Sequence, residues 1–368
     1  MSFSSADHVW MAQALRLAEY GLYTTTPNPR VGCVVVKNSQ VVGSGWHRRA
    51  GEPHAEIHAL RAAGPLASGA TVYVTLEPCS HQGRTPPCTR ALIDAGVSCV
   101  IIAMLDPNSK VNGEGIRQLR AAGIVVQTGL LSAEAQALNI GFITRMQLGR
   151  PWVRMKIAAS LDGKTALRNG QSKWITGEAA RRDAHQWRAR SCAILTGIGT
   201  ILSDDAQLNV RHVETSRQPV RVVLDTSLGL PLQAKILAEE GGQTWVFTTT
   251  TDQRKIQSLQ QAGADVMVVP EQAGKVDLYA VMTSLAKLEI NELLIEAGAT
   301  LNGALAACGL VDEMILYLAP MLLGDQARGM LALGELIHLS DRIELQNLDW
   351  RQVGKDMRLM ATLAKRQV

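Results

Sequence analysis

A histidine, a glutamate and two cysteines in the first quarter of the chain constrain it more than any other feature. His54 and Glu56 are separated by one residue, and Cys79 and Cys88, each preceded by proline, follow them. One imidazole and two thiolates can hold a catalytic zinc ion that keeps its fourth position for water. A glutamate beside that water can carry a proton to a departing amine. The pattern predicts a hydrolytic zinc site with ligands His54, Cys79 and Cys88 and catalytic Glu56.

The cysteine spacing departs from the usual signature of zinc deaminases. That signature is H-x-E followed by P-C-x-x-C, whereas residues 80–87 separate Cys79 from Cys88 here. A single H-x-E is common by chance, and isolated cysteines are usually buried apolar residues. The order of the pieces favours zinc, because a strand predicted over Ala70–Leu76 leads to Cys79. Both Pro-Cys pairs also lie where a loop enters a helix, which stabilises thiolates.

Length and charge limit the classes of protein to consider. A chain of 368 residues is expected to form two domains. The net charge of +4 is small, and basic and acidic residues are interspersed, which argues against nucleic-acid and membrane partners. With no leader pattern and no long apolar stretch, we expect a cytoplasmic protein. The remaining cysteines are expected to be core residues: Cys33, Cys99, Cys192 and Cys308.

Alternating strand and helix patterns predict layered α/β architecture in both halves. Asn28, between two prolines, is expected in a rigid turn, where it either bonds its own backbone or presents its amide to a ligand. The segment Arg145–Pro151, which contains glycine and proline, is expected to end a helix and connect the domains. We therefore expect domains over 1–146 and 147–368.

Two glycine clusters follow strands in the second half. Gly197 and Gly199 begin a dinucleotide-binding fingerprint, but Leu202 stands where the third glycine is required. The strand Leu293–Glu296 runs into a glycine-containing turn and then a helix, whose first N–H groups could hold a phosphate. A plain tight turn is the alternative.

Motifs along essentially the whole chain resemble the bifunctional riboflavin-biosynthesis deaminase/reductase family. They are Pro27-Asn28-Pro29, Gly51–Glu56, Thr75–His81, Gly83–Cys88, Lys156, Ser160–Lys164, Ser172–Thr176, Asp204-Asp205 and Glu296–Gly298. The long cysteine spacing separates this family from cytidine deaminases and transfer-RNA adenosine deaminases. The resemblance implies a cytidine-deaminase-like three-layer α/β/α domain followed by a dihydrofolate-reductase-like α/β domain.

The resemblance also implies two successive reactions. The first is zinc-dependent hydrolytic deamination of 2,5-diamino-6-(5-phosphoribosylamino)pyrimidin-4-one, and the second is NADPH-dependent reduction of the ribosyl group to ribityl. We accordingly expect one Zn²⁺ per chain in the first domain and NADPH in the second. The expected partner is a small phosphorylated pyrimidine, with no nucleic acid and no membrane, and we expect a homo-oligomer, either a dimer or a tetramer.

Three further groups of site residues are implied by the same resemblance. Contacts to the deaminase substrate are Asn28, His47, His81 and Arg84. Contacts to the nicotinamide cofactor are Ala158, Trp174, Thr200, Asp204, Thr226, Gly298, Ala299, Thr300, Leu301, Asn302, Gly303 and Ala304. Contacts to the reductase substrate are Lys156, Ser172, Thr176, Arg188, Leu208, Arg211 and Glu296. Arg188 and Arg211 suit a phosphate. Asp204 is expected to handle a proton, with a helix cap as the alternative, and His47 and His81 could instead be ordinary loop histidines.

Two other classes of function compete with this interpretation. A nucleic-acid or nucleoside base deaminase with an appended nucleotide-binding domain would be expected to show a basic surface, which the charge balance argues against. A catalytically inactive binding module would be expected to lack a metal ligand or Glu56, and all four residues are present.

Overall fold

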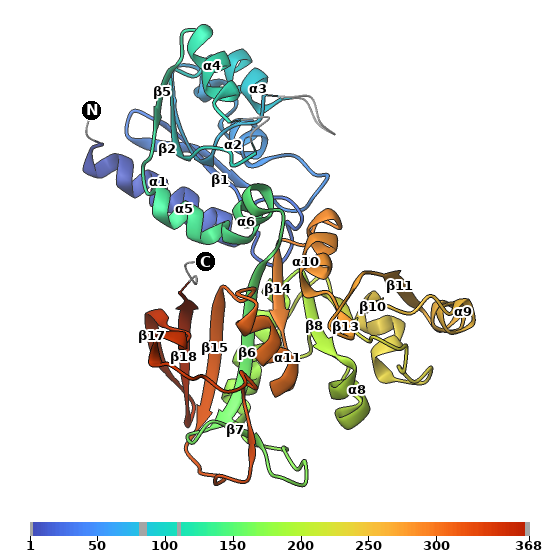
Figure 1. Ribbon diagram of the computed structural model, residues 1–368. Helices are drawn as coiled ribbons and strands as arrows, with labels where there is room; N and C mark the ends of the chain where they lie inside the picture. Colours follow the sequence, from blue (N-terminus) through green and yellow to red (C-terminus); the bar gives the residue numbers. More distant parts are fainter. Residues whose placement is uncertain (1–2, 81–86, 109–111, 365–368) are drawn as a thin grey trace. The chain divides into compact units, whose positions relative to one another are not determined.

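The computed structural model describes residues 3–80, 87–108 and 112–364. They form two compact units, Met1–Gly149 and Arg150–Val368, each built on its own sheet (Figure 1). Among the described residues, we find no helix with both the length and the apolar composition needed to span a bilayer.

The first unit contains a five-stranded sheet. Its strands are β1 (Gly32–Lys37), β2 (Gln40–Trp46), β3 (Thr71–Leu76), β4 (Cys99–Met104) and β5 (Val125–Thr128), in the order β2-β1-β3-β4-β5. β1 is antiparallel to both neighbours, whereas β3, β4 and β5 are parallel. Cys33, Val34 and Val35 of β1 are fully buried. Such a continuous apolar run is typical of a strand that is covered on both faces.

Helices cover both faces of this sheet. α1 (Ser5–Glu19) and α5 (Ser132–Leu138) contact one face, and α2 (Ala55–Ala63), α3 (Cys88–Asp94) and α4 (Glu114–Ala121) lie on the other (Figure 1). α1 approaches β1 so closely that a Cβ on Gly32 would lie 1.9 Å from the Ala14 carbonyl oxygen. The unit is therefore a three-layer α/β/α domain, as predicted.

The helix before the second unit runs further than expected. α6 (Ile140–Leu148) includes residues 145–148, which we had predicted to lie in a connection. Gly149, with φ of +64°, is the residue that leaves the helical conformation. The predicted helix end at Arg145 was therefore wrong, because the helix continues until Gly149 caps its C-terminus.

The second unit contains a nine-stranded sheet, in the order β11-β10-β9-β8-β14-β6-β15-β18-β17. The strands are β6 (Trp152–Ser160), β8 (Ala193–Gly197), β9 (Val220–Leu224), β10 (Thr244–Thr248), β11 (Ala264–Val268), β14 (Glu292–Ile295), β15 (Glu313–Ala319), β17 (Leu345–Val353) and β18 (Asp356–Leu363). In this spatial order, all strands from β11 to β15 are parallel to one another. The predicted terminal hairpin, β17 and β18, adds to β15 with antiparallel strands. The carboxyl ends of the parallel strands therefore share one edge, where α/β proteins place their ligands.

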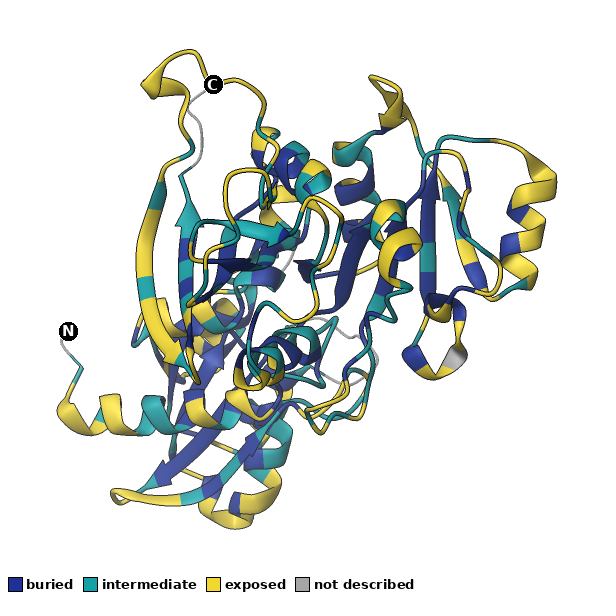
Figure 2. Cartoon of the chain, turned by 90° about the horizontal axis from the view of Figure 1, so that it is seen from below, coloured by how far each residue is buried: buried dark blue, intermediate teal, exposed yellow. Residues whose placement is uncertain are grey.

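Shorter elements complete this unit. Its helices are α7 (Glu178–Arg190), α8 (Ile198–Asp204), α9 (Gln253–Gln261), α10 (Leu278–Lys287) and α11 (Ala299–Ala307). Four short strands form two separate antiparallel pairs. β12 (Glu271–Gln272) pairs with β13 (Lys275–Val276), and β7 (Lys164–Ala166) pairs with β16 (Arg328–Gly329). Short 3₁₀ helices cover Lys235–Leu237, Glu239–Gly241 and Leu339–Asp341, and another, Gly64–Ala67, belongs to the first unit. The central strands are buried, dark blue in Figure 2, whereas the edge strand β17 is mostly exposed.

Candidate active sites

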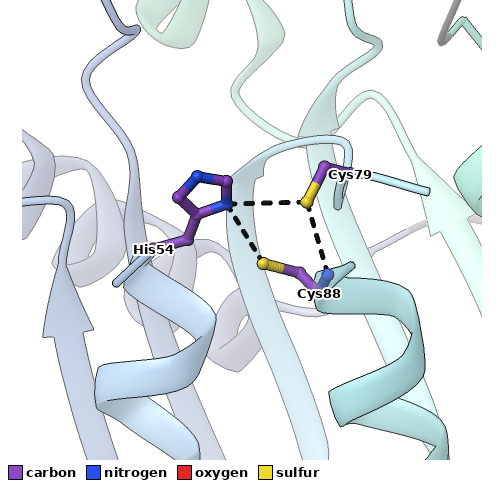
Figure 3. A group of neighbouring side chains, drawn as sticks. All are labelled: His54, Cys79 and Cys88. Carbon is purple, nitrogen blue, oxygen red and sulfur yellow. Dashed lines mark hydrogen bonds between the residues drawn. The ribbon is translucent and has the colours of Figure 1, made fainter. Parts of the chain in front are cut away.

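Three separate segments of the first unit bring together one imidazole and two thiols. His54 is the N-cap of α2, Cys88 is the first residue of α3, and Cys79 lies in the loop after β3. His54 Nδ1 lies 3.2 Å from Cys88 Sγ and 3.5 Å from Cys79 Sγ, and the three ligand atoms all lie within 4.8 Å of one another (Figure 3). Ligands of a tetrahedral zinc ion are roughly 3.5 to 3.8 Å apart, given its bond lengths. The donor set and its spacing therefore fit zinc.

The local backbone favours a thiolate at Cys79. The backbone N–H of Cys88 donates to Cys79 Sγ at 3.3 Å, as the start of α3 leaves that group without a partner inside the helix. Hydrogen bonds from Cys88 and His54 lower the pKa of the Cys79 thiol to about 4. A negatively charged sulfur is the form that binds a metal.

Glu56 lies in the first turn of α2, two residues beyond His54. Its side chain is only 3% exposed. Burial, together with the neighbouring Cys79, raises the pKa of the Glu56 carboxyl to about 7. A carboxyl group with a pKa near neutrality can both accept and donate a proton under ordinary conditions.

Asn28 and His47 form a connected pair close to this cluster. Asn28 Nδ2 lies 3.0 Å from His47 Nε2, and His47 Nδ1 lies 3.2 Å from the Pro53 carbonyl oxygen. His47 is 2% exposed, its burial lowers its pKa, and its ring stands edge-on to that of His54. A neutral His47 thus donates from Nδ1 to Pro53 and accepts from Asn28 at Nε2. His81 and Arg84 lie outside the described residues.

Glu77 is a buried acid near the cysteine loop to which the sequence assigned no role. Its carboxylate accepts backbone N–H groups from four residues at 3.0 to 3.4 Å: Asp106, Gly113, Gly115 and Ile116. A Cβ on Gly115 would lie 2.3 Å from the Pro78 carbonyl oxygen. Glu77 therefore fixes the start of α4 against the segment that delivers Cys79.

In the second unit, three predicted residues meet at the carboxyl end of β14. Glu296 receives two hydrogen bonds from Arg188, at 2.6 and 2.9 Å, and one from Lys156 Nζ at 3.2 Å. Although burial opposes ionisation, Arg188 and Lys156 hold the pKa of Glu296 well below its usual range. The site thus contains a fixed carboxylate between two cations.

Next to this group lies a cavity of about 360 Å³. Five predicted residues line it: Trp174, Arg188, Asp204, Leu208 and Arg211. The sequence did not identify its other lining residues: Lys173, Asp205, Ala206, Gln207 and Lys235. Lys235 pairs with Asp205 at 3.0 Å. Arg181, which does not line the cavity, stacks over the exposed Trp174 ring. A cavity rich in Lys and Arg suits an anionic ligand.

Asp204 is the last residue of α8, and the left-handed Asp205 follows it. The alternative of an N-terminal helix cap is therefore wrong. Gly197 does precede a helix, as the dinucleotide fingerprint requires, but that helix has seven residues.

The glycine turn after β14 divides into exposed and buried parts. Gly298 is the N-cap of α11, and Gly298 and Thr300 are exposed. Asn302 is buried and donates to the Ala297 carbonyl oxygen, and a Cβ on Gly303 would lie 2.1 Å from the Ala332 carbonyl oxygen. Other described residues expected at this site do not line the cavity: Lys156, Ala158, Ser172, Thr176, Thr200, Thr226, Glu296, Ala299, Leu301 and Ala304.

Both halves match known protein families. Residues 4–104 match the cytidine and deoxycytidylate deaminase zinc-binding region, and residues 151–359 match the RibD C-terminal domain. The riboflavin biosynthesis protein RibD of Escherichia coli is 48% identical over 363 residues, which are 95% of this chain and 98% of that protein. The chain belongs to the RibD family. RibD of Haemophilus influenzae is 45% identical and covers 98% of this chain and 99% of its own length.

Solved RibD structures share this fold. One form of Acinetobacter baumannii RibD has a TM-score of 0.90 and 45% identity, covering 98% of this chain and 99% of that one. A Thermotoga maritima protein, named a diaminohydroxyphosphoribosylaminopyrimidine deaminase/5-amino-6-(5-phosphoribosylamino)uracil reductase, has a TM-score of 0.85 and 31% identity, with 98% and 99% coverage. The predicted family and the two-part fold are therefore confirmed, and the chain combines a zinc-binding deaminase domain with a reductase domain.

Proposed function

We propose that the first domain deaminates 2,5-diamino-6-(5-phosphoribosylamino)pyrimidin-4-one and that the second reduces the ribosyl group of the product to ribityl with NADPH. The observation that carries the proposal is the His54, Cys79 and Cys88 cluster with Glu56 beside it, in a chain that also holds the charged Glu296 site. Membership of a deaminase/reductase family supports the combination of the two reactions.

In the deaminase site, each side chain has a separate role. His54, Cys79 and Cys88 would hold zinc, which would lower the pKa of a water at the site towards neutrality. Glu56 takes the proton of that water and delivers it to the departing amine. Asn28 presents its amide to the pyrimidine, and His47 fixes the direction of that amide through its hydrogen bond. His81 and Arg84 remain proposed substrate contacts.

In the reductase site, the cofactor supplies the hydride and the protein positions the sugar. Glu296, held by Lys156 and Arg188, contacts the ribose hydroxyls together with Ser172 and Thr176. The cations of Arg188 and Arg211 bind the phosphate. Asp204, exposed at the cavity wall, delivers the proton that accompanies the hydride. Leu208 closes the apolar side of the substrate.

The cofactor contacts are proposed along the carboxyl edge of the sheet. The exposed start of α11, at Gly298 and Thr300, offers N–H groups to the pyrophosphate. Other proposed contacts are Ala158, Trp174, Thr200, Asp204, Thr226, Ala299 and Leu301 to Ala304, of which Asn302 and Gly303 shape the turn from within.

The partners of two acids near Thr226 favour NADPH over NADH. An NAD site typically uses a carboxylate at a strand end to bind the ribose 2′-hydroxyl. Asp225, which directly follows β9, is 1% exposed and accepts the N–H of Leu230 at 2.8 Å. Asp252 accepts N–H groups of Arg254 and Lys255 as the cap of α9. Both carboxylates are already used, which suits a site for a 2′-phosphate.

The direct test is to incubate the purified chain with the diaminopyrimidine phosphate and to identify products by mass spectrometry. Without NADPH, we expect a product in which oxygen replaces the amino nitrogen. With NADPH, we expect that product to gain two hydrogen atoms. An unchanged substrate, or deamination of cytidine in its place, would contradict the proposal.

A further inference from the structure

Arg211 lies in a segment without regular secondary structure. The Arg211 loop, residues 207–212, connects α8 to the approach to β9 and contributes to the wall of the basic cavity. The Arg211 side chain is exposed, and its Nη1 donates to Asn209 Oδ1 at 2.7 Å and to Gln207 Oε1 at 3.1 Å. The direction of the guanidinium therefore depends on the conformation of this loop.

Side chains from outside the loop hold its backbone at three successive residues. Arg188 Nη1 donates to the Asn209 carbonyl oxygen at 2.9 Å. The Gln218 amide accepts the N–H of Val210 at 2.7 Å and donates to its carbonyl oxygen at 3.1 Å. His185 Nδ1 accepts the N–H of Arg211 itself at 3.2 Å. The backbone of Arg211 is thus anchored by an imidazole.

The position of His185 on α7 allows this contact. It is 5% exposed and lies one turn before Arg188, so the same helix face holds both the Arg211 loop and Glu296. The exposed His212 ring packs edge-on against it, with 4.7 Å between centroids. Burial and the cations of Arg188 and Arg211 lower the pKa of His185 to about 3. The imidazole therefore stays neutral, with an acceptor at Nδ1 and its proton on Nε2.

We propose that His185 is a positioning residue of the reductase site, which accepts the Arg211 N–H and so fixes the Arg211 loop for recognition of the substrate's phosphate. This inference rests on the proposed reductase function. It assigns a role to a residue that is not itself in the cavity wall, and it makes α7 the common support of the phosphate site and the Glu296 site.

Two amide variants of the full chain test the role of the Nδ1 acceptor. In His185→Asn the amide oxygen can take the place of Nδ1, whereas in His185→Gln the amide lies where Nε2 stands. With NADPH and the deaminated phosphorylated substrate, we expect His185→Gln to raise KM about tenfold, the effect of one lost hydrogen bond, and to leave kcat within about twofold. His185→Asn should stay within about twofold of wild type in both constants.

The dephosphorylated substrate provides the second comparison. All variants should reduce it with the KM of the wild type, because the Arg211 loop then has no phosphate to bind. His212→Leu, which removes the ring contact but not the hydrogen bond, should keep the wild-type KM for the phosphorylated substrate.

Three results would overturn the role of His185: equal KM values for the Asn and Gln variants, equal effects on both substrates, or a His212→Leu effect as large as that of His185→Gln. If wild-type enzyme fails to reduce the phosphorylated substrate, the proposed function itself is wrong. The two failures are thereby distinguishable. Melting curves for each variant distinguish a loss of folding from a raised KM. If the Gln variant does not fold while the Asn variant does, the difference in folding supports the role of Nδ1 as an acceptor.

Discussion

At the scale of single residues, the proposed deaminase site assigns metal binding and proton transfer to different side chains. The three ligand atoms face one another, whereas Glu56 approaches from the same helix as His54 but carries no ligand atom in the cluster. The two functions can therefore be removed one at a time.

Glu56→Gln is expected to retain zinc and lose deamination. The amide keeps the size of the side chain but cannot carry a proton, so the rate should fall by about 10² to 10⁴. Metal analysis should give the same zinc content as wild type, and the variant should still oxidise NADPH with the deaminated substrate. Loss of both activities together would contradict separate sites.

Cys88→Ser is expected to weaken zinc binding, because a neutral hydroxyl replaces a thiolate. Cys99→Ser is the matched control, since Cys99 begins β4 and lies outside the ligand group. Zinc per chain after dialysis should fall for the first variant and stay constant for the second. An undiminished zinc content in Cys88→Ser would remove Cys88 from the ligand set.

His185 also makes the stability of the second domain depend on pH. Its folded pKa of about 3 lies below the ordinary value of 6.5, so on acidification the unfolded chain takes up a proton that the folded chain refuses. The contribution of His185 to stability is complete above pH 6.5 and is lost as the pH falls towards 3. His185→Asn should flatten this dependence by up to about 1.4 kcal/mol per pH unit.

Urea unfolding, followed by tryptophan fluorescence at steps between pH 6.5 and pH 4, measures this slope. Five of the tryptophans lie in the second unit, at 152, 174, 187, 245 and 350. His212→Asn, at an exposed neighbouring position, is the control. Equal slopes for His185→Asn and wild type would exclude the contribution.

At the scale of elements, the sequence predicted regular structure better than loops. The strand predicted over Ala70–Leu76 is β3, and the helix predicted at the second Pro-Cys pair is α3, which begins at Cys88. The helix start predicted at the first pair was wrong, because Cys79 lies in the loop after β3. β3 and α3 have a clear apolar period and recognisable starts. This is why the zinc cluster could be predicted as a group from residues far apart in the chain.

The loop contacts could not be predicted, because they use backbone groups. Glu77 binds N–H groups 29 to 39 residues away, and His185 accepts from a residue 26 positions later. Any residue but proline offers such an N–H, so no sequence pattern marks the partner. In the second half, Gly303 meets a requirement that the glycine spacing does not reveal, because α11 packs closely on Ala332 there.

Glu77→Gln tests whether the buried Glu77 carboxylate holds the start of α4 in place. The amide turns one acceptor into a donor facing backbone N–H groups, so unfolding of the first domain should become easier by about 2 kcal/mol. Glu114→Gln, which breaks an exposed pair with Arg117, should change the melting temperature little. Calorimetry of both variants makes the comparison, and equal melting temperatures would show that Glu77 does not anchor α4.

At the scale of the whole molecule, the described residues of each candidate site belong to a single unit. The zinc group and Glu56 come from Met1–Gly149, and the Glu296 group and the basic cavity come from Arg150–Val368. The two proposed reactions would also differ in kind, since the first would need zinc and the second a nicotinamide cofactor. The domains should consequently respond separately to a change that affects only one of them.

Removal of zinc by a chelator is such a change. A ligand stabilises the folded state to which it binds, so the first domain should melt at a lower temperature and the second at an unchanged one. Deamination should disappear and return when zinc is added back, while NADPH oxidation with the deaminated substrate persists throughout. Calorimetry and the two assays on the same samples decide the question. A parallel loss of reduction would mean that the second site depends on the metal in the first.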